Sequence, residues 1–108
     1  FKIIHCDEFQ SEGIDKIVKR IKERVGNNPL YLSIDIDVLD PAFAPGTGTP
    51  EVAGMTTREI VNVIRGLSGT KLISADVVEV SPAYDHAEVT SLAAATIVYE
   101  LTNLFAKK

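Results

Sequence analysis

Apolar residues recur along the chain at two different spacings, which predict strands and helices in turn. Three short apolar runs are typical of buried strands, namely residues 1–5, 30–37 and 71–80. After each run, apolar residues recur every three or four positions, as on one helix face, at residues 11–26, 56–67 and 89–104. The order β-α-β-α-β-α predicts an α/β fold in which a parallel sheet lies between two layers of helices.

Two further patterns refine this prediction. Thr56 and Glu59 have the spacing of a capping box, so the middle helix should begin directly after Thr56. Residues 71–80 are apolar at odd and even positions alike, as in a strand buried on both faces. We therefore expect helices to cover both sides of the sheet.

Composition limits the partners and the setting. The chain has 108 residues, of which 45% are hydrophobic, enough for one packed domain. A net charge of −4 argues against a nucleic-acid or anionic-membrane partner, and we see no apolar run that approaches the roughly 18 residues of a membrane span. Cys6 is the single cysteine, which fits a reducing compartment such as the cytoplasm. Because the chain begins with Phe1 inside a strand-like run, we expect it to be a fragment.

Carboxylates at the ends of the predicted strands are the first candidate for chemistry. Ser33, Asp35 and Asp37 should share one face of their strand, about 6.6 Å from one to the next. Two carboxylates this close in a poorly solvated place repel each other, and a divalent cation such as Mg²⁺ or Mn²⁺ removes the conflict. The alternative is that these aspartates cap amides or pair with lysines, but their alternation at the end of an apolar strand favours a metal.

Two classes of enzyme place paired aspartates at such a position. Haloacid-dehalogenase-type phosphatases have an apolar strand that ends in DxD, and "YLSIDIDVL" (residues 31–39) fits a loose form of that motif. That class also needs a second acidic pair at another strand end, and no aspartate pair follows "KLISADVVEV" (residues 71–80). It leaves the Pro/Gly/Thr-rich loop after Asp40 unexplained.

The loop resembles a different family. "SIDIDVLDPAFAPGTGTPE" meets every specified position of the ureohydrolase signature S-x-D-x-D-x-x-D-P-x-x-x-P-x-T-G-T-P, from Ser33 to Pro50. "DVVEVSPAYD" (residues 76–85) is similar to the substrate-binding strand of agmatinases, whereas arginases tend to have asparagine where Ser81 stands. The resemblance covers essentially all of residues 1–108. It implies the C-terminal third of a single arginase-like domain with a three-layer α/β/α fold.

The resemblance also implies roles for individual residues. Asp35 would bridge two Mn²⁺ ions and Asp37 would bind one of them, and a metal-bridging hydroxide would attack the guanidinium carbon and release urea and an amine. Glu79 would act as the catalytic and substrate-binding carboxylate that pairs with the guanidinium, because a forked cation suits a carboxylate. Thr49 would line the substrate pocket, held there by a stiff loop.

Other polar residues are expected to have structural roles. We interpret Asp40 as a turn residue rather than a metal ligand, and Asp76 as structural because it lies on the opposite strand face from Glu79. His5 and His86 match no ligand position of the family, and a lone histidine in a loop is usually a surface residue. The "GGDH" and "DAHxD" motifs, which supply the family's other ligands, do not occur in this sequence.

The resulting hypothesis is an agmatinase-like enzyme that hydrolyses agmatine to putrescine and urea, with this fragment inactive alone and binding Mn²⁺ weakly. Guanidinobutyrase or another guanidino-acid hydrolase is the nearest alternative, and arginase ranks lower. A non-catalytic binding or assembly domain is the alternative from another class. Because truncation should expose sheet and helix surface, we also expect a homo-oligomer.

Overall fold

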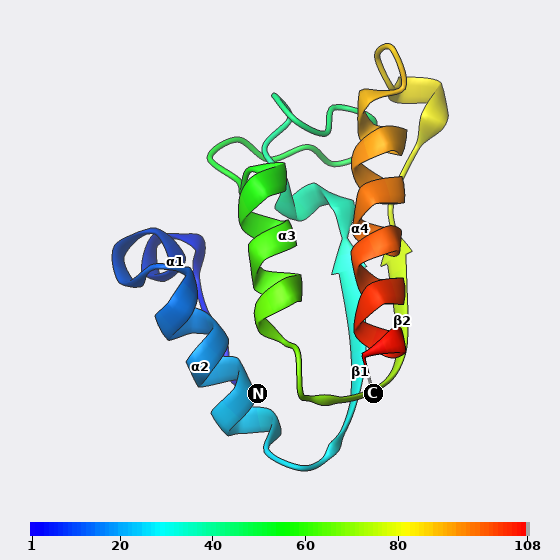
Figure 1. Ribbon diagram of the computed structural model, residues 1–108. Coiled ribbons are helices and arrows are strands. Elements are labelled where there is room, and N and C mark those ends of the chain that lie inside the picture. Colours follow the sequence, from blue (N-terminus) through cyan, green and yellow to red (C-terminus); the bar gives the residue numbers. More distant parts are fainter. Residues whose placement is uncertain (108) are drawn as a thin grey trace.

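Two parallel strands and the helices packed on them make up the computed structural model, which describes residues 1–107 (Figure 1). Strand β1 (Pro29–Asp35) pairs with β2 (Lys71–Val78). The other elements, in chain order, are α1 (Cys6–Glu12), α2 (Ile14–Val25), the 3₁₀ helix η1 (Ile36–Val38), α3 (Thr57–Gly66), the 3₁₀ helix η2 (Pro82–Tyr84) and α4 (Val89–Ala106). The predicted α/β class with a parallel sheet is confirmed.

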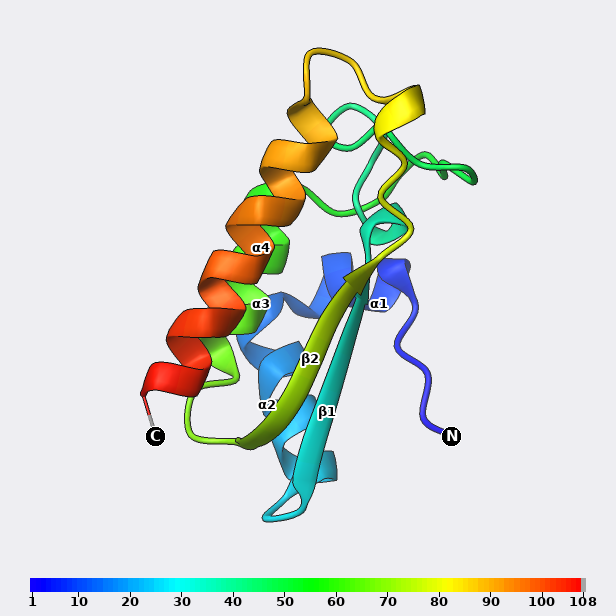
Figure 2. The same ribbon diagram turned by 90° about the vertical axis from the view of Figure 1, so that its right-hand side faces the viewer.

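The two faces of the sheet differ in what covers them. Leu32 and Ile34 face α3 and α4, which lie together on one side of the sheet (Figure 2). Tyr31, Ser33 and Asp35 alternate with them and are exposed. Burial of the apolar set therefore fixes which way the carboxylate of Asp35 points. Of the two helical layers expected, residues 1–107 form the one that contains α3 and α4.

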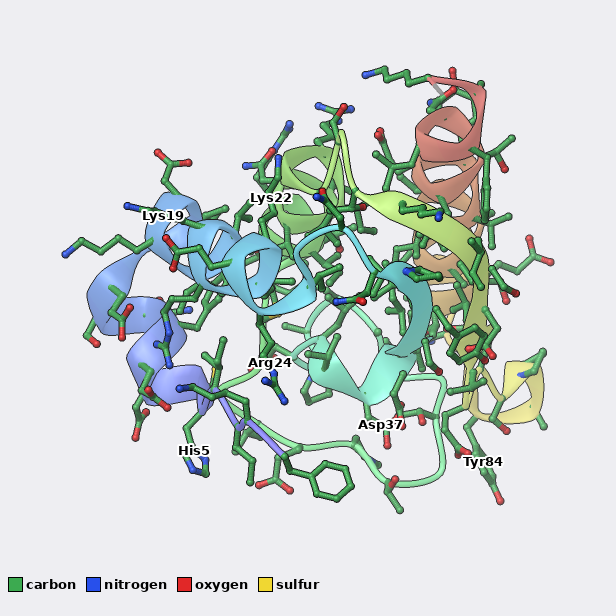
Figure 3. All side chains as sticks on the ribbon, turned by 90° about the horizontal axis from the view of Figure 1, so that it is seen from below. His5, Lys19, Lys22, Arg24, Asp37 and Tyr84 are labelled. Carbon is green, nitrogen blue, oxygen red and sulfur yellow. The ribbon has the colours of Figure 1, made fainter. Side chains whose placement is uncertain are left out.

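Helix α2 packs beside α3 and presents a charged outer face. Gly66 of α3 lies so close to Val18 that a Cβ on this glycine would come within 2.8 Å of a Val18 methyl group. Lys19 and Arg24 are exposed on α2 (Figure 3), whereas Lys22 reaches toward the end of α3 and donates to the Ser68 carbonyl at 2.8 Å. This face matches the solvated face of an amphipathic helix.

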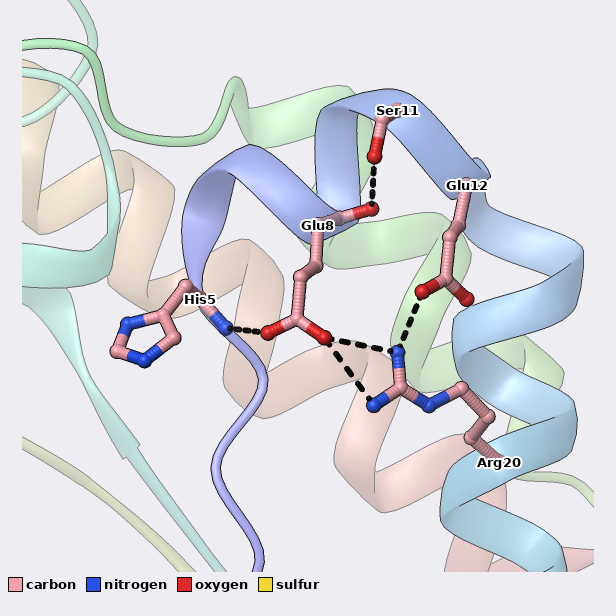
Figure 4. Close-up of polar contacts among 5 residues, drawn as sticks. All are labelled: His5, Glu8, Ser11, Glu12 and Arg20. Carbon is pink, nitrogen blue, oxygen red and sulfur yellow. Dashed lines mark hydrogen bonds and ion pairs between the residues drawn. The ribbon is translucent and has the colours of Figure 1, made fainter.

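The prediction of a strand at residues 1–5 is wrong. These residues have no regular structure and lead into α1, a short helix that the apolar spacing did not reveal. Glu8 accepts a hydrogen bond from the His5 amide at 2.9 Å, and Arg20 of α2 donates to Glu12 at 2.7 Å and to Glu8 at 3.3 Å (Figure 4). An apolar run becomes a strand only beside a partner strand, and in residues 1–107 this run has none.

Helix α3 begins where its capping box predicts. The Glu59 amide donates to the Thr56 hydroxyl at 3.1 Å, and the Thr56 amide donates to the Glu59 carboxylate at 2.7 Å. Two of the free amides at the start of the helix are thereby satisfied. These bonds also hold the pKa of Glu59 below its ordinary value, with the backbone bond from Thr56 as the largest cause.

Helix α4 corrects the expectation that no apolar run approaches a membrane span. Val89–Ala106 is 18 residues long and apolar enough, by length and composition alone, to cross a membrane. Its polar residues are mostly Thr, Ser and Asn, which interrupt the apolar run in the sequence without lowering its hydropathy much. In the structure its inner face packs on α3 and β2, with Ile97 fully buried and Glu100 paired with Arg65 at 2.6 Å. The core helix of a folded domain has the same length and composition.

Candidate active site

The carboxyl end of β1 carries the paired aspartates, but not both on the strand. Asp35 is the last residue of β1, and its carboxylate accepts a hydrogen bond from the Asp37 amide at 2.9 Å. That bond turns the chain into η1, which contains Asp37. The expectation that both carboxylates alternate along one extended strand is therefore wrong in this detail. The side chain of Asp37 points away from α3 and α4, toward the open face of the sheet (Figure 3).

Two threonines of the following loop hold the Asp37 carboxylate from both sides. The Thr47 hydroxyl donates to Oδ1 and the Thr49 hydroxyl donates to Oδ2. Thr47 is buried, whereas Thr49 is exposed. Thr49 was predicted to line the pocket, whereas Thr47 had no predicted role, although both belong to the "TGTP" of the signature. The loop thus fixes the direction of one candidate ligand.

The base of this loop is closed by backbone bonds and by Asp40. The Asp40 carboxylate accepts from the amides of Ala42 at 2.8 Å and Ala53 at 2.9 Å. The Asp40 amide donates to the Met55 carbonyl at 2.9 Å, and the Met55 amide donates to the Val38 carbonyl at 2.8 Å. Both carboxylate oxygens of Asp40 accept hydrogen bonds from loop amides, which confirms its interpretation as a turn residue.

The carboxyl end of β2 places Glu79 differently from the prediction. The strand ends at Val78, so Glu79 lies just beyond it rather than inside a strand that continues to Val80. Its φ of 67° is left-handed, a conformation that costs a non-glycine residue about 1–3 kcal/mol. Its side chain is exposed, and within residues 1–107 its carboxylate has no hydrogen-bonding or ionic partner. The carboxylate is thus free to meet a cation.

The loop and the segment after β2 are joined directly. The Ser81 amide donates to the Gly46 carbonyl at 2.8 Å, and the Gly46 amide donates to the Thr90 hydroxyl of α4 at 2.7 Å. Neither contact was predicted, because it joins residues far apart in the sequence.

The remaining polar residues named from the sequence stay outside this arrangement. Ser33 donates to Asp76 at 2.6 Å and Tyr31 also donates to Asp76, which holds the pKa of that carboxyl below its ordinary value. This agrees with a structural role for Asp76. His5 precedes α1 and His86 lies in the turn before α4, both exposed.

The carboxylates at the β1 end suit a hard divalent cation, but they are too few for a centre of their own. Within residues 1–107, no group of three or more His, Cys, Asp or Glu side chains is arranged to hold a metal ion. Asp35 and Asp37 lie close together, since the Asp37 amide reaches the Asp35 carboxylate. Oxygen ligands of this kind fit Mn²⁺ or Mg²⁺. Further ligands would have to come from outside these residues.

A family model that describes the arginase family matches residues 1–103. The chain belongs to the arginase family. The resemblance seen in residues 33–50 and 76–85 is therefore confirmed.

Several relatives within the arginase family are similar over nearly the whole chain. A Schizosaccharomyces pombe protein whose name classes it as a candidate agmatinase is 61% identical over 99% of this chain, which covers 27% of that protein. The agmatinase of Photorhabdus laumondii is 48% identical over the entire chain, which covers 35% of it. The chain thus spans about a third or less of the length of the curated relatives it matches.

Solved structures of the family have the same fold in the matching part. A Burkholderia thailandensis protein described as a hypothetical agmatinase matches 97% of the chain with a TM-score of 0.95 and 45% identity, over 33% of its own chain. Proclavaminate amidino hydrolase of Streptomyces clavuligerus matches 98% with a TM-score of 0.96 and 44% identity, over 35% of its own chain. These matches confirm the arginase-like fold.

Proposed function

We propose that residues 1–108 are the C-terminal part of a single ureohydrolase domain, and that the complete protein is a binuclear manganese enzyme most similar to agmatinase. The observation that carries this proposal is the pair of strand ends. Asp35 and Asp37 stand at one end with threonines fixing Asp37, and the free carboxylate of Glu79 stands at the neighbouring end. Family membership and the names of the relatives support it.

Each residue then has a defined task in hydrolysing agmatine to putrescine and urea. Asp35 would bridge two Mn²⁺ ions and Asp37 would bind one, and the ions would supply water that ionises at neutral pH. Glu79 would pair with the planar guanidinium, whose forked N–H groups match the two oxygens of a carboxylate. Thr49 would hold Asp37 and contact the guanidinium nitrogens from the same loop.

Guanidino acids are a second candidate class of substrate, which differ from agmatine in the group at the far end of the alkyl chain. The chain is as similar to proclavaminate amidino hydrolase as to the hypothetical agmatinase of Burkholderia thailandensis, with 44% and 45% identity. This supports guanidino acids, such as guanidinobutyrate, as an alternative to agmatine. The Bacillus subtilis arginase is 33% identical, and arginine ranks lower because Ser81 stands where arginases tend to have asparagine.

Urea release with Mn²⁺ from agmatine, guanidinobutyrate and arginine tests the function. We expect release from agmatine by the longer protein that carries this chain, loss of release in an Asp35→Asn variant, and none from the 108-residue chain alone. Asp15→Asn, on the exposed face of α2, is the matched control and should retain full activity. Inertness toward all three substrates would overturn the ureohydrolase proposal, and full turnover by the 108-residue chain would overturn the incomplete metal site.

Self-association and a cytoplasmic location belong to the same proposal. Tyr31, Ile73 and Val78 leave apolar surface exposed on the sheet, and Leu92 and Tyr99 do so on α4. Exposed apolar surface of this kind is often covered by another part of the protein or by a second copy. We expect the 108-residue chain to elute above its monomer mass of 11.7 kDa on size exclusion, and elution as a monomer would contradict this.

A further inference from the structure

Thr90, near the start of α4, is a buried polar residue with no role in the chemistry proposed above. Its exposed fraction is 0%, although it belongs to a helix whose opposite side is open. Its hydroxyl accepts the Gly46 amide proton at 2.7 Å, a contact between residues 44 positions apart. This hydrogen bond joins α4 to the loop between Asp40 and Met55, which is called the signature loop below.

Asp85 holds the start of α4, and with it the backbone of Thr90. Its carboxylate accepts from the amides of His86 at 2.9 Å, Thr90 at 3.0 Å and Ser91 at 3.0 Å, and also from the Ser91 hydroxyl at 3.2 Å. Burial alone would raise the pKa of Asp85, but these bonds outweigh it and hold the pKa well below its ordinary value. The start of α4 is thereby held in place, and the Thr90 hydroxyl oxygen is available there as the acceptor for the Gly46 amide.

Gly46 connects α4 to the segments that follow both strands. Its amide points to α4, and its carbonyl accepts from the Ser81 amide at 2.8 Å, two residues after Glu79. A Cβ at Gly46 would lie 2.8 Å from the Asp85 Cβ and 2.9 Å from the Thr90 hydroxyl, so the peptide fits closely against α4. Three residues further along the loop, Thr49 donates to Asp37.

We propose that Thr90 is a positioning residue for the reaction, which fixes the loop bearing Thr49 and the segment bearing Glu79 relative to each other through the Gly46 peptide. This inference rests on the proposed function. Displacing a group that binds the reacting part of a substrate by about 1 Å can lower the rate by about a hundredfold, even when the change lies away from the chemistry.

Three variants separate positioning from helix stability. Thr90→Val keeps the shape but removes the acceptor, Thr90→Ser restores it, and Thr102→Val is the matched control. Thr102 is exposed on α4, where its hydroxyl donates to the Val98 carbonyl at 2.9 Å. Should the valine variant fail to fold, Thr90→Cys takes its place, since a thiol is a weaker acceptor of similar size.

Amide hydrogen exchange in the 108-residue chain measures the restraint directly. We expect Thr90→Val to speed exchange at Gly46 and Ser81 by about tenfold or more, because the Gly46 amide loses its acceptor. Thr90→Ser and Thr102→Val should exchange as the wild type does at both positions. Unchanged exchange at Gly46 in the valine variant would overturn the inference.

Kinetics of the longer, Mn²⁺-loaded protein measure the consequence. Thr90→Val should lower kcat/KM for agmatine by about tenfold to a hundredfold with bound Mn²⁺ unchanged, and Thr90→Ser should recover most of it. Wild-type kcat/KM in the valine variant of an active enzyme would overturn the inference and leave the proposed function intact. If the wild type releases no urea from any guanidino substrate, the proposed function fails, and the exchange experiment still decides whether Thr90 fixes the loop.

Discussion

The ends of the two strands hold their carboxylates in opposite ways. At the end of β1, the carboxylates of Asp35 and Asp37 already accept hydrogen bonds from a backbone amide and from two threonines. At the end of β2, Glu79 has a left-handed backbone and a carboxylate without a partner in residues 1–107. The difference suits their proposed tasks, because a metal ligand benefits from being fixed in advance whereas a substrate ligand must remain open.

The largest expected effect is the loss of urea release, and Mn²⁺ binding then distinguishes the two strand ends. In the longer protein, Asp37→Ala and Glu79→Ala should each lower urea release by about a thousandfold or more. Asp37→Ala should also weaken Mn²⁺ binding, measured by isothermal titration calorimetry, whereas Glu79→Ala should leave it unchanged. Equal loss of Mn²⁺ in both variants would remove the distinction between the ends. Asp15→Ala serves as the control on the surface of α2.

The stiffness of the β1 end can be broken at one glycine. A Cβ at Gly54 would lie 2.6 Å from the Asp40 amide nitrogen and 2.8 Å from the Val38 carbonyl, whereas one at Gly48 would meet nothing within 4 Å. Gly54→Ala should therefore lower the free energy of unfolding by about 2–3 kcal/mol, since backbone atoms cannot move aside easily. Gly48→Ala should change it by less than about 0.5 kcal/mol. Denaturant unfolding followed by circular dichroism measures both, and equal effects would contradict the closed loop base.

The two strand ends could be predicted because the residues of each end lie within one short segment of the sequence, residues 33–50 and 76–85. The signature from Ser33 to Pro50 and the β2 segment identify the family, and the capping box at Thr56 gives the start of α3. Local patterns of this kind report local structure.

The features that could not be predicted from the sequence depend mostly on contacts between distant segments. Residues 1–5 are as apolar as a strand, but no strand in residues 1–107 pairs with them. Asp37 leaves the strand because a single side-chain bond from its own amide to Asp35 starts a turn. The role of Thr90 depends on a glycine 44 positions away, which no apolar spacing encodes.

Glu79 offers a smaller test of the β2 end. Glu79→Gly should raise the free energy of unfolding by about 0.5–1 kcal/mol, because glycine adopts a φ of 67° without strain although it also gains entropy in the unfolded chain. Asp35→Gly, at a φ of −80°, should lower the free energy of unfolding instead. Denaturant unfolding in metal-free buffer compares them. A loss of stability in Glu79→Gly would show that its backbone is not strained.

The smallest expected effect is a loss of folding stability at acidic pH. Because hydrogen bonds lower the pKa of Asp85 in the folded chain, its contribution to stability is complete above its ordinary value of 3.8 and declines as the pH falls below it. The wild type should therefore lose more stability between pH 5 and pH 3 than Asp85→Asn does. Thermal unfolding across that pH range measures the two slopes. Parallel slopes would show that the charge of Asp85 contributes nothing to the order of this segment.

The closed base of the signature loop has a consequence for engineering. A hydrogen bond between Asp40 and Met55 joins its two ends, and Val52, three residues before Met55, is 74% exposed. Because its side chain is exposed, a dye at this position should not disturb the packing. A fluorescent dye on a Val52→Cys, Cys6→Ser variant would therefore report events at the strand ends while leaving the fold in place.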